Sequence, residues 1–141
     1  MKNLRIYSSD KNIPKKKLHQ FVKLVLGDLE LSLASLELNF INSKKIREIN
    51  KQYLSHDYST DIITFNYSEK ESLIDGEIFI SYQDAAENAK KYKVKYIEEI
   101  GRLIVHGILH LIGYDDLTPD KRKKMKNQEN RLIKKYKFIL L

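Results

Sequence analysis

The chain has 141 residues, a length typical of one domain and sufficient to bury a hydrophobic core. It contains no cysteine, which excludes disulfide frameworks and thiolate metal sites, so histidine and carboxylate side chains would have to bind any metal ion. Neither an N-terminal apolar segment nor a run of roughly eighteen apolar residues is present. We therefore expect a single cytoplasmic domain over residues 1–141, without a membrane anchor.

The net charge of +7 is concentrated near the C-terminus. Residues 118–141 contain nine lysines and arginines against two acids, Asp120 and Glu129, so this segment carries the whole excess. A localised positive charge attracts polyanions through long-range electrostatics and counterion release. Solvated helix faces have the same composition, so charge alone does not separate a nucleic-acid surface from an ordinary exposed helix.

The first half of the chain predicts two strands with a helix between them, followed by a second helix. Leu4–Tyr7 is a short apolar strand candidate, and helical spacing of apolar residues predicts a helix over Ile13–Leu29, with Pro14 in its first turn. Alternating apolar and polar residues predict a strand at Leu36–Phe40. The order strand, helix, strand favours parallel pairing. Ser43 is suited to cap the next helix.

The second half predicts a hairpin and three helices. The segments DIITFNY (Asp61–Tyr67) and GEIFISY (Gly76–Tyr82) are rich in β-branched and aromatic residues, and their short separation favours an antiparallel hairpin. Helical patterns follow at Asp84–Tyr92 and Tyr96–Ile112, and the second is apolar around most of its C-terminal half, which is typical of a central buried helix. The Thr-Pro pair at 118–119 is typical of the cap and first residue of a last helix.

The stretch HGILHLIGYDD, residues 106–116, has the pattern of a metal site. His106 and His110 are one helical turn apart, so both imidazoles project from one face and can converge on one cation. Gly113 is suited to end the helix in a left-handed conformation that returns Asp115 and Asp116 towards that face. A single core histidine is commonly satisfied by a backbone carbonyl, but this combination favours a metal. Two histidines and a carboxylate suit both zinc and non-haem iron.

The sequence also lacks a feature of one class of zinc enzymes. In the HExxH proteases a glutamate directly follows the first histidine and acts as general base, whereas Gly107 follows His106 here. Glu98 and Glu99 lie about two turns before His106, roughly 10 Å along the helix axis and too far away to act directly. We interpret both glutamates as helix-surface charges.

Three segments together resemble one protein family. HGILHLIGYDD resembles the HGxLHLxGYDH signature of the YbeY family. The members of this family are bacterial metal-dependent endoribonucleases that act in ribosome maturation. INKQYLSHDYSTDIITFNY and DGEIFISYQDAAENAKKY are similar to two further family segments, so the resemblance covers roughly residues 35–118. It implies a small α/β (α+β) sandwich, in which a mixed four-stranded sheet is packed by about five helices and the metal site lies on a central buried helix.

The resemblance implies a function and ligands. The function is single-strand-specific cleavage in ribosomal RNA maturation, at the 3′ end of the small-subunit RNA, and in ribosome quality control. The partners would be ribosomal RNA and the small ribosomal subunit, and the cofactor one Zn²⁺ or another divalent metal. The metal ligands fall on His106, His110 and Asp116, through which the chain would catalyse. Asp116 departs from the family pattern, which usually has histidine at this position. Asp115 would support the ligands without binding the metal itself.

The RNA contacts implied by the resemblance are less complete. Leu54 stands where the family has a basic residue thought to contact the RNA phosphate, and His56 in the same loop is a candidate replacement. Thr60 and Asp61 match a Thr-Asp pair of the family, for which turn formation and strand capping are the alternative roles. Further candidate RNA-binding residues belong to the basic C-terminal helix: Lys121, Arg122, Lys123 and Lys124.

Three functional hypotheses follow from these residues. In the first, the metal activates water or stabilises negative charge during RNA cleavage, and phosphoryl chemistry tolerates the absence of a helix glutamate because it depends mainly on charge neutralisation. In the second, the protein binds RNA or the ribosome without catalysis and the metal is structural. In the third, the same ligands serve another zinc hydrolase or an iron oxygenase, which would need a deep apolar pocket.

Overall fold

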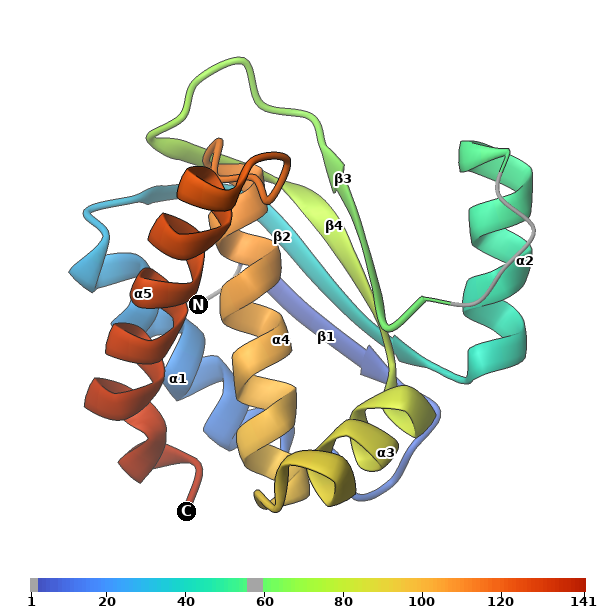
Figure 1. The fold of residues 1–141 in the computed structure, drawn as a ribbon. Coiled ribbons are helices and arrows are strands. Elements are labelled where there is room, and N and C mark those ends of the chain that lie inside the picture. The colour runs from blue at the N-terminus through green and yellow to red at the C-terminus, as the bar shows by residue number, and fades with distance from the viewer. Residues whose placement is uncertain (1–2, 56–59) are drawn as a thin grey trace.

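The computed structural model describes residues 3–55 and 60–141. Within these ranges the chain forms four strands and five α-helices. Figure 1 shows how they are arranged. The elements are β1 (Leu4–Ser8), α1 (Lys15–Asp28), β2 (Ser32–Ile41), α2 (Ser43–Leu54), β3 (Ile62–Asn66), β4 (Leu73–Ser81), α3 (Tyr82–Tyr92), α4 (Tyr96–Leu111), α5 (Pro119–Tyr136) and the short 3₁₀ helix η1 (Lys137–Ile139). The predicted α/β class is confirmed.

The sheet is mixed, with the strand order β1-β2-β4-β3. β1 pairs in parallel with β2, and β3 pairs antiparallel with β4, so both predicted pairings are confirmed. β2 also pairs in parallel with β4, from Ser32 opposite Leu73 to Ile41 opposite Ser81. Because β2 and β4 lie beside each other along this length, both strands begin earlier than the sequence pattern predicts.

One face of the sheet is covered by α1 and α4, with α5 packed against both helices (Figure 1). Alternate residues of the central strands point to this face and are fully buried, namely Leu36, Leu38 and Phe40 of β2 and Ile78 and Ile80 of β4. Ten of the 16 residues of α4 are buried, which confirms the predicted central helix. A side chain that projects from α4 into the space between the sheet and α5 therefore packs against neighbours on both sides.

The opposite face of the sheet carries α2 over its β3–β4 half (Figure 1). Ile46 and Ile49 of α2 form a small second core with Ile63 of β3. Phe65 and Phe79, from β3 and β4, pack edge to face against each other in the same region, with ring centroids 5.9 Å apart. This core is separate from the main core, so α2 does not touch the face on which α4 lies.

Two helix starts differ from the expectations and a third agrees with them. Asn42, not Ser43, caps α2, because its side-chain oxygen accepts a hydrogen bond from the Lys45 amide at 2.8 Å. Pro14 precedes the first turn of α1 instead of lying within it. The predicted cap of α5 is confirmed, since the hydroxyl of Thr118 accepts from the Lys121 amide at 3.2 Å.

Among the described helices, none is both long and apolar enough to cross a membrane.

Candidate active site

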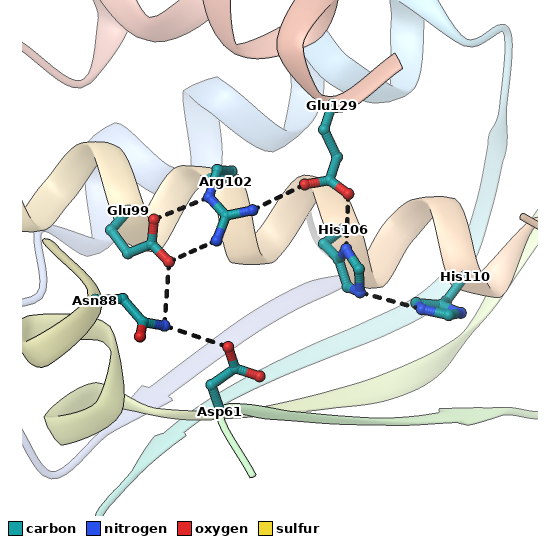
Figure 2. A network of polar contacts seen from close by, with 7 residues as sticks. All are labelled: Asp61, Asn88, Glu99, Arg102, His106, His110 and Glu129. Atoms are coloured by element: carbon teal, nitrogen blue, oxygen red, sulfur yellow. Dashed lines mark hydrogen bonds and ion pairs between the residues drawn. The ribbon is translucent and has the colours of Figure 1, made fainter. Parts of the chain in front are cut away.

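The two histidines of α4 meet at their ring nitrogens. His106 and His110 are one turn apart, and their Nε2 atoms lie 3.1 Å from each other (Figure 2). Both residues are partly buried, and the rings meet at an interplanar angle of 68°. Burial, assisted by the neighbouring His106, lowers the pKa of His110 from its ordinary value. Two nitrogens at this separation either share a proton or can bind a common cation.

A carboxylate from α5 fixes the orientation of His106. Glu129 is only 2% exposed, and its Oε2 lies 2.7 Å from His106 Nδ1. A carboxylate can only accept a hydrogen bond, so Nδ1 carries a proton, and in the neutral imidazole the lone pair is then on Nε2. That lone pair points towards His110. This is the tautomer that a histidine needs in order to bind a metal through Nε2.

Arg102 of α4 connects Glu129 to a second buried carboxylate, that of Glu99 (Figure 2). Its Nη1 donates to Glu129 Oε1 at 3.0 Å, while Nε and Nη2 donate to the two oxygens of Glu99 at 2.9 and 2.8 Å. Glu99 is 1% exposed, so its interpretation as a surface charge was wrong. The sequence pattern missed this because Arg102, one turn away on the same helix, compensates the charge. Glu98 is more exposed and pairs with Lys137.

The network extends to the start of β3. The side-chain amide of Asn88, on α3, donates to Asp61 Oδ2 at 3.3 Å and to Glu99 Oε2 at 3.4 Å (Figure 2). Burial raises the pKa of Asp61, while the nearby His106 acts in the opposite direction. The network thus contains three acidic side chains and one guanidinium: Arg102 bonds Glu99 and Glu129, while Asp61 is joined to Glu99 through the amide of Asn88. The network therefore favours additional positive charge beside the histidine pair.

Gly107 explains why no glutamate follows His106. A Cβ atom on Gly107 would lie 2.8 Å from Ile78 Cδ1 and 3.1 Å from Ile62 Cδ1. The position thus faces the sheet and not the histidine pair, and the missing side chain lets α4 approach β3 and β4 closely. A carboxylate at this point would be buried in the core and could not reach a substrate. The fold excludes a general base of the HExxH kind.

The turn after α4 delivers its two aspartates to different places. Gly113 has a φ of 103°, which confirms the predicted left-handed turn. Asp116 is exposed and lines the same pocket as His106, and its charge acts to raise the pKa of His110. Asp115 instead accepts from the Leu117 amide at 3.0 Å and pairs with Lys121 at 3.5 Å. Across residues 3–55 and 60–141, no three His, Asp or Glu side chains are assembled for metal binding.

The pocket beside His106 has a volume of about 470 Å³ and lies between α4 and the first turns of α5. Its wall includes His106, Asp116 and Glu129, together with the cations Arg122, Lys123 and Lys126 of α5. Of the basic residues predicted to bind RNA, Arg122 and Lys123 therefore lie at the site. Lys121 and Lys124 line a different pocket of about 350 Å³, next to Tyr114 and Asp115.

Comparison with known proteins gives a consistent result. Residues 3–137 match the family described as "Endoribonuclease YbeY". Proteins of that name from Parabacteroides distasonis and Bacteroides fragilis are 40% and 39% identical, and the aligned parts cover 90% and 86% of this chain and 91% and 87% of those proteins. The solution structure of TM1509 from Thermotoga maritima superposes with a TM-score of 0.70 at 25% identity, over 95% of this chain and 89% of that one. The chain belongs to the YbeY family.

Other positions singled out by resemblance to the YbeY family lie away from the histidine pair or have local partners. Leu54, at the C-terminus of α2, is 41% exposed. The hydroxyl of Thr60 donates to the Ile62 carbonyl at 3.4 Å, as a turn residue would, and Asp61 belongs to the network of Figure 2. His56 lies outside the described residues.

Sequence reasoning missed Glu129 and Arg102. A signal for Glu129 exists, because it falls between Met125 and Leu132 on the apolar stripe of α5, and a charged residue at a core position needs a buried partner. The identity of that partner could not be read from the pattern, since His106 and Arg102 come from another helix.

Proposed function

We propose that the protein is a metal-dependent endoribonuclease that cleaves single-stranded RNA. In the cell it would act in the cytoplasm on ribosomal RNA of the small subunit, in maturation of the 3′ end and in ribosome quality control. Membership of the YbeY family supports the reaction class. The observation that carries the proposal is the pair of Nε2 atoms 3.1 Å apart, of which one is set as a lone-pair donor by Glu129.

The residues present suit a divalent cation such as Zn²⁺. His106 and His110 would bind it through Nε2, and Asp116 would complete the ligands from the turn that follows α4. The excess of carboxylates in the network beside His106 adds electrostatic attraction for a cation. When bound, the metal would lower the pKa of a water molecule or neutralise charge on a phosphoryl oxygen. Asp115 is then free to hold the turn through Leu117 and Lys121.

The chain's own residues would orient the reaction. Glu129 holds the ring of His106, Arg102 holds Glu129, and the buried packing of α4 keeps both rings on one side of the helix. The basic residues of the adjoining pocket would bind the anionic substrate. No step requires a glutamate at position 107, because phosphoryl transfer depends mainly on positioning and charge stabilisation.

Cleavage assays with metal analysis test this proposal. Zinc-replete protein should cut single-stranded RNA in preference to duplex RNA, and His110→Ala and Asp116→Ala should lose activity together with bound metal. His19→Ala is a matched control, because it removes an imidazole from α1 and should retain both properties. Metal retained by Asp116→Ala would contradict the assigned third ligand and point to Asp115. Cleavage that persists without metal would contradict the mechanism.

One observation favours a second candidate function, that of a non-catalytic RNA-binding or ribosome-binding factor. Asp116 is exposed and is not assembled with the histidine pair within the described parts of the chain. A bound metal would then be structural, although a structural site normally has a fourth protein ligand. RNA binding by the metal-replete protein without any cleavage would favour this function over the nuclease.

A further inference from the structure

The basic residues of α5 divide into two groups by helical geometry. Arg122 and Lys126 are four residues apart and Lys123 lies next to them, so they form one stripe along α5, which we call the site-facing stripe. All three line the pocket of His106. Lys121 and Lys124 are three residues apart and line the pocket of Tyr114 and Asp115 on the other flank of the helix. One run of consecutive cations therefore serves two surfaces.

The two flanks also differ in their charge balance. On the flank of Lys121 three cations have acidic partners: Lys121 pairs with Asp115, and Arg131 and Lys135 both pair with Asp28 of α1. Lys124, on the same flank, forms no ion pair with a described residue. The site-facing stripe has none, since Arg122, Lys123 and Lys126 form no ion pair with any other residue that the structure describes. All three side chains are exposed. Of the five cations of α5 without an acidic partner among the described residues, three therefore line the pocket of His106, and the other two are Lys124 and Lys134.

We propose that the site-facing stripe binds backbone phosphates of the single RNA strand next to the bond that is cut. This inference deepens the proposed function and rests on it. Arg122 and Lys126 are about 6 Å apart along the helix, so they can contact neighbouring phosphates of one strand. The guanidinium of Arg122 can bind a phosphate through two parallel hydrogen bonds. Pro119 lines the same pocket at the start of α5, where the helix dipole adds positive potential.

The chemistry of the pocket indicates how sequence-specific this contact would be. Apart from His106, the described residues lining it include no ring on which a base could stack, and its polar groups near α5 are mainly cations. Such a surface is suited mainly to phosphates, so it should hold the strand with little sequence preference and with strong dependence on salt. Sequence preference, where it exists, would have to come from another part of the surface.

Two charge-matched variants test the inference. Arg122→Gln/Lys123→Gln/Lys126→Gln removes the site-facing stripe, whereas Lys121→Gln/Lys124→Gln/Lys134→Gln removes three exposed cations elsewhere on α5. Binding of metal-depleted protein to a fluorescent single-stranded 2′-O-methyl oligonucleotide is measured over a range of salt concentrations. Each phosphate contact contributes about 0.7 to the slope of log K against log salt, so the first variant should lower this slope by about 2. The control should change it by much less.

Two outcomes overturn the inference: equal effects of the two triple variants, or an unchanged slope in the first. Thermal unfolding confirms that both variants fold, as expected for exposed positions. A different result would contradict the proposed function and leave this inference intact: metal-replete wild-type protein that binds the cleavable single strand with the expected salt dependence but does not cut it. In that case the stripe would still be an RNA surface, because its test uses protein without metal.

Discussion

At the scale of single residues, the hydrogen bond between Glu129 and His106 has the clearest chemical consequence. It joins Nδ1 to a buried carboxylate at 2.7 Å and so determines which nitrogen of the ring is free. The opposite tautomer would leave the carboxylate without a proton to accept and would place N–H on the atom that faces His110. Arg102 keeps the carboxylate in position from the other side, at 3.0 Å.

Glu129→Gln should therefore alter the histidine more than the fold. The amide of glutamine can donate to Nδ1, which moves the ring proton to Nε2 and removes the lone pair needed for metal binding. We expect the ring of His106 to change tautomer, which its ¹⁵N NMR shifts would report. Zinc affinity should fall by about 10–100-fold. Glu98→Gln is the control, since Glu98 pairs with Lys137 outside the network. An unchanged tautomer with unchanged affinity would contradict the positioning role.

Substitution of Gly107 tests whether a helix glutamate is compatible with this fold. In Gly107→Glu the carboxylate would lie against Ile62 and Ile78, where nothing offsets its desolvation. We expect a loss of more than about 3 kcal/mol in the free energy of unfolding, measured by chemical denaturation. Gly27→Glu on α1 is a matched control, because no atom lies within 4 Å of its Cβ position and glutamate favours helix. Similar stability of the two variants would refute the packing argument.

At the scale of elements, α5 is fastened to the rest of the molecule at two points along its length. Near its middle, Glu129 contacts α4 through His106 and Arg102. Further along, Arg131 and Tyr136 both bond Asp28 of α1 at 2.7 Å, and Lys135 joins them at 3.2 Å. The second attachment limits rotation of α5 and so keeps the site-facing stripe turned towards His106.

Asp28→Asn should loosen this attachment in a pH-dependent way. Hydrogen bonding to Arg131, Tyr136 and Lys135 holds the pKa of Asp28 well below its usual value of about 3.8. Its contribution to stability is therefore complete above about pH 4–5 and is lost as the pH falls towards the folded-state pKa. We expect the variant to lose about 1–3 kcal/mol at pH 7, and to differ less from wild type near pH 2, in urea unfolding. The exposed Glu69→Gln should show neither effect.

At the scale of the whole molecule, the site joins segments that are distant in the sequence. Asp61 precedes β3, Asn88 lies on α3, Arg102 and His106 on α4, and Glu129 on α5. A cation bound between the histidines would therefore stabilise the tertiary structure and not α4 alone.

Zinc should accordingly raise the melting temperature of the protein. A ligand that binds only the folded state, at a concentration 100 times its Kd, adds about 2.7 kcal/mol, which corresponds to several degrees for a chain of this size. His110→Ala should lose the zinc-dependent shift, while His19→Ala should keep it. Equal shifts in both variants, measured by scanning calorimetry, would place the stabilising ion elsewhere.

Much of the fold was predictable because it depends on local patterns. The helical spacing of apolar residues in 96–112 and the Thr-Pro start of α5 are readable within a few residues, and both are confirmed. The pairing of β2 with β4 was not predicted, because alternation along a strand reports which face is buried and not which strand lies beside it. The cap of α2 was predicted one residue too late, because Asn42 and Ser43 are both good cap residues and the sequence does not say which of them accepts the hydrogen bond.

The sequence by itself determined the two histidines one turn apart, the glycine turn after them and the position of the basic helix, because each depends on spacing within one element. Only the tertiary structure decided that Glu129 orients His106, that Glu99 is buried, and that three of the eight cations of α5 are paired with carboxylates. These facts depend on which surfaces of separate helices meet. Hydrogen bonds and ion pairs between distant segments leave no period in the sequence, so packing alone decides them.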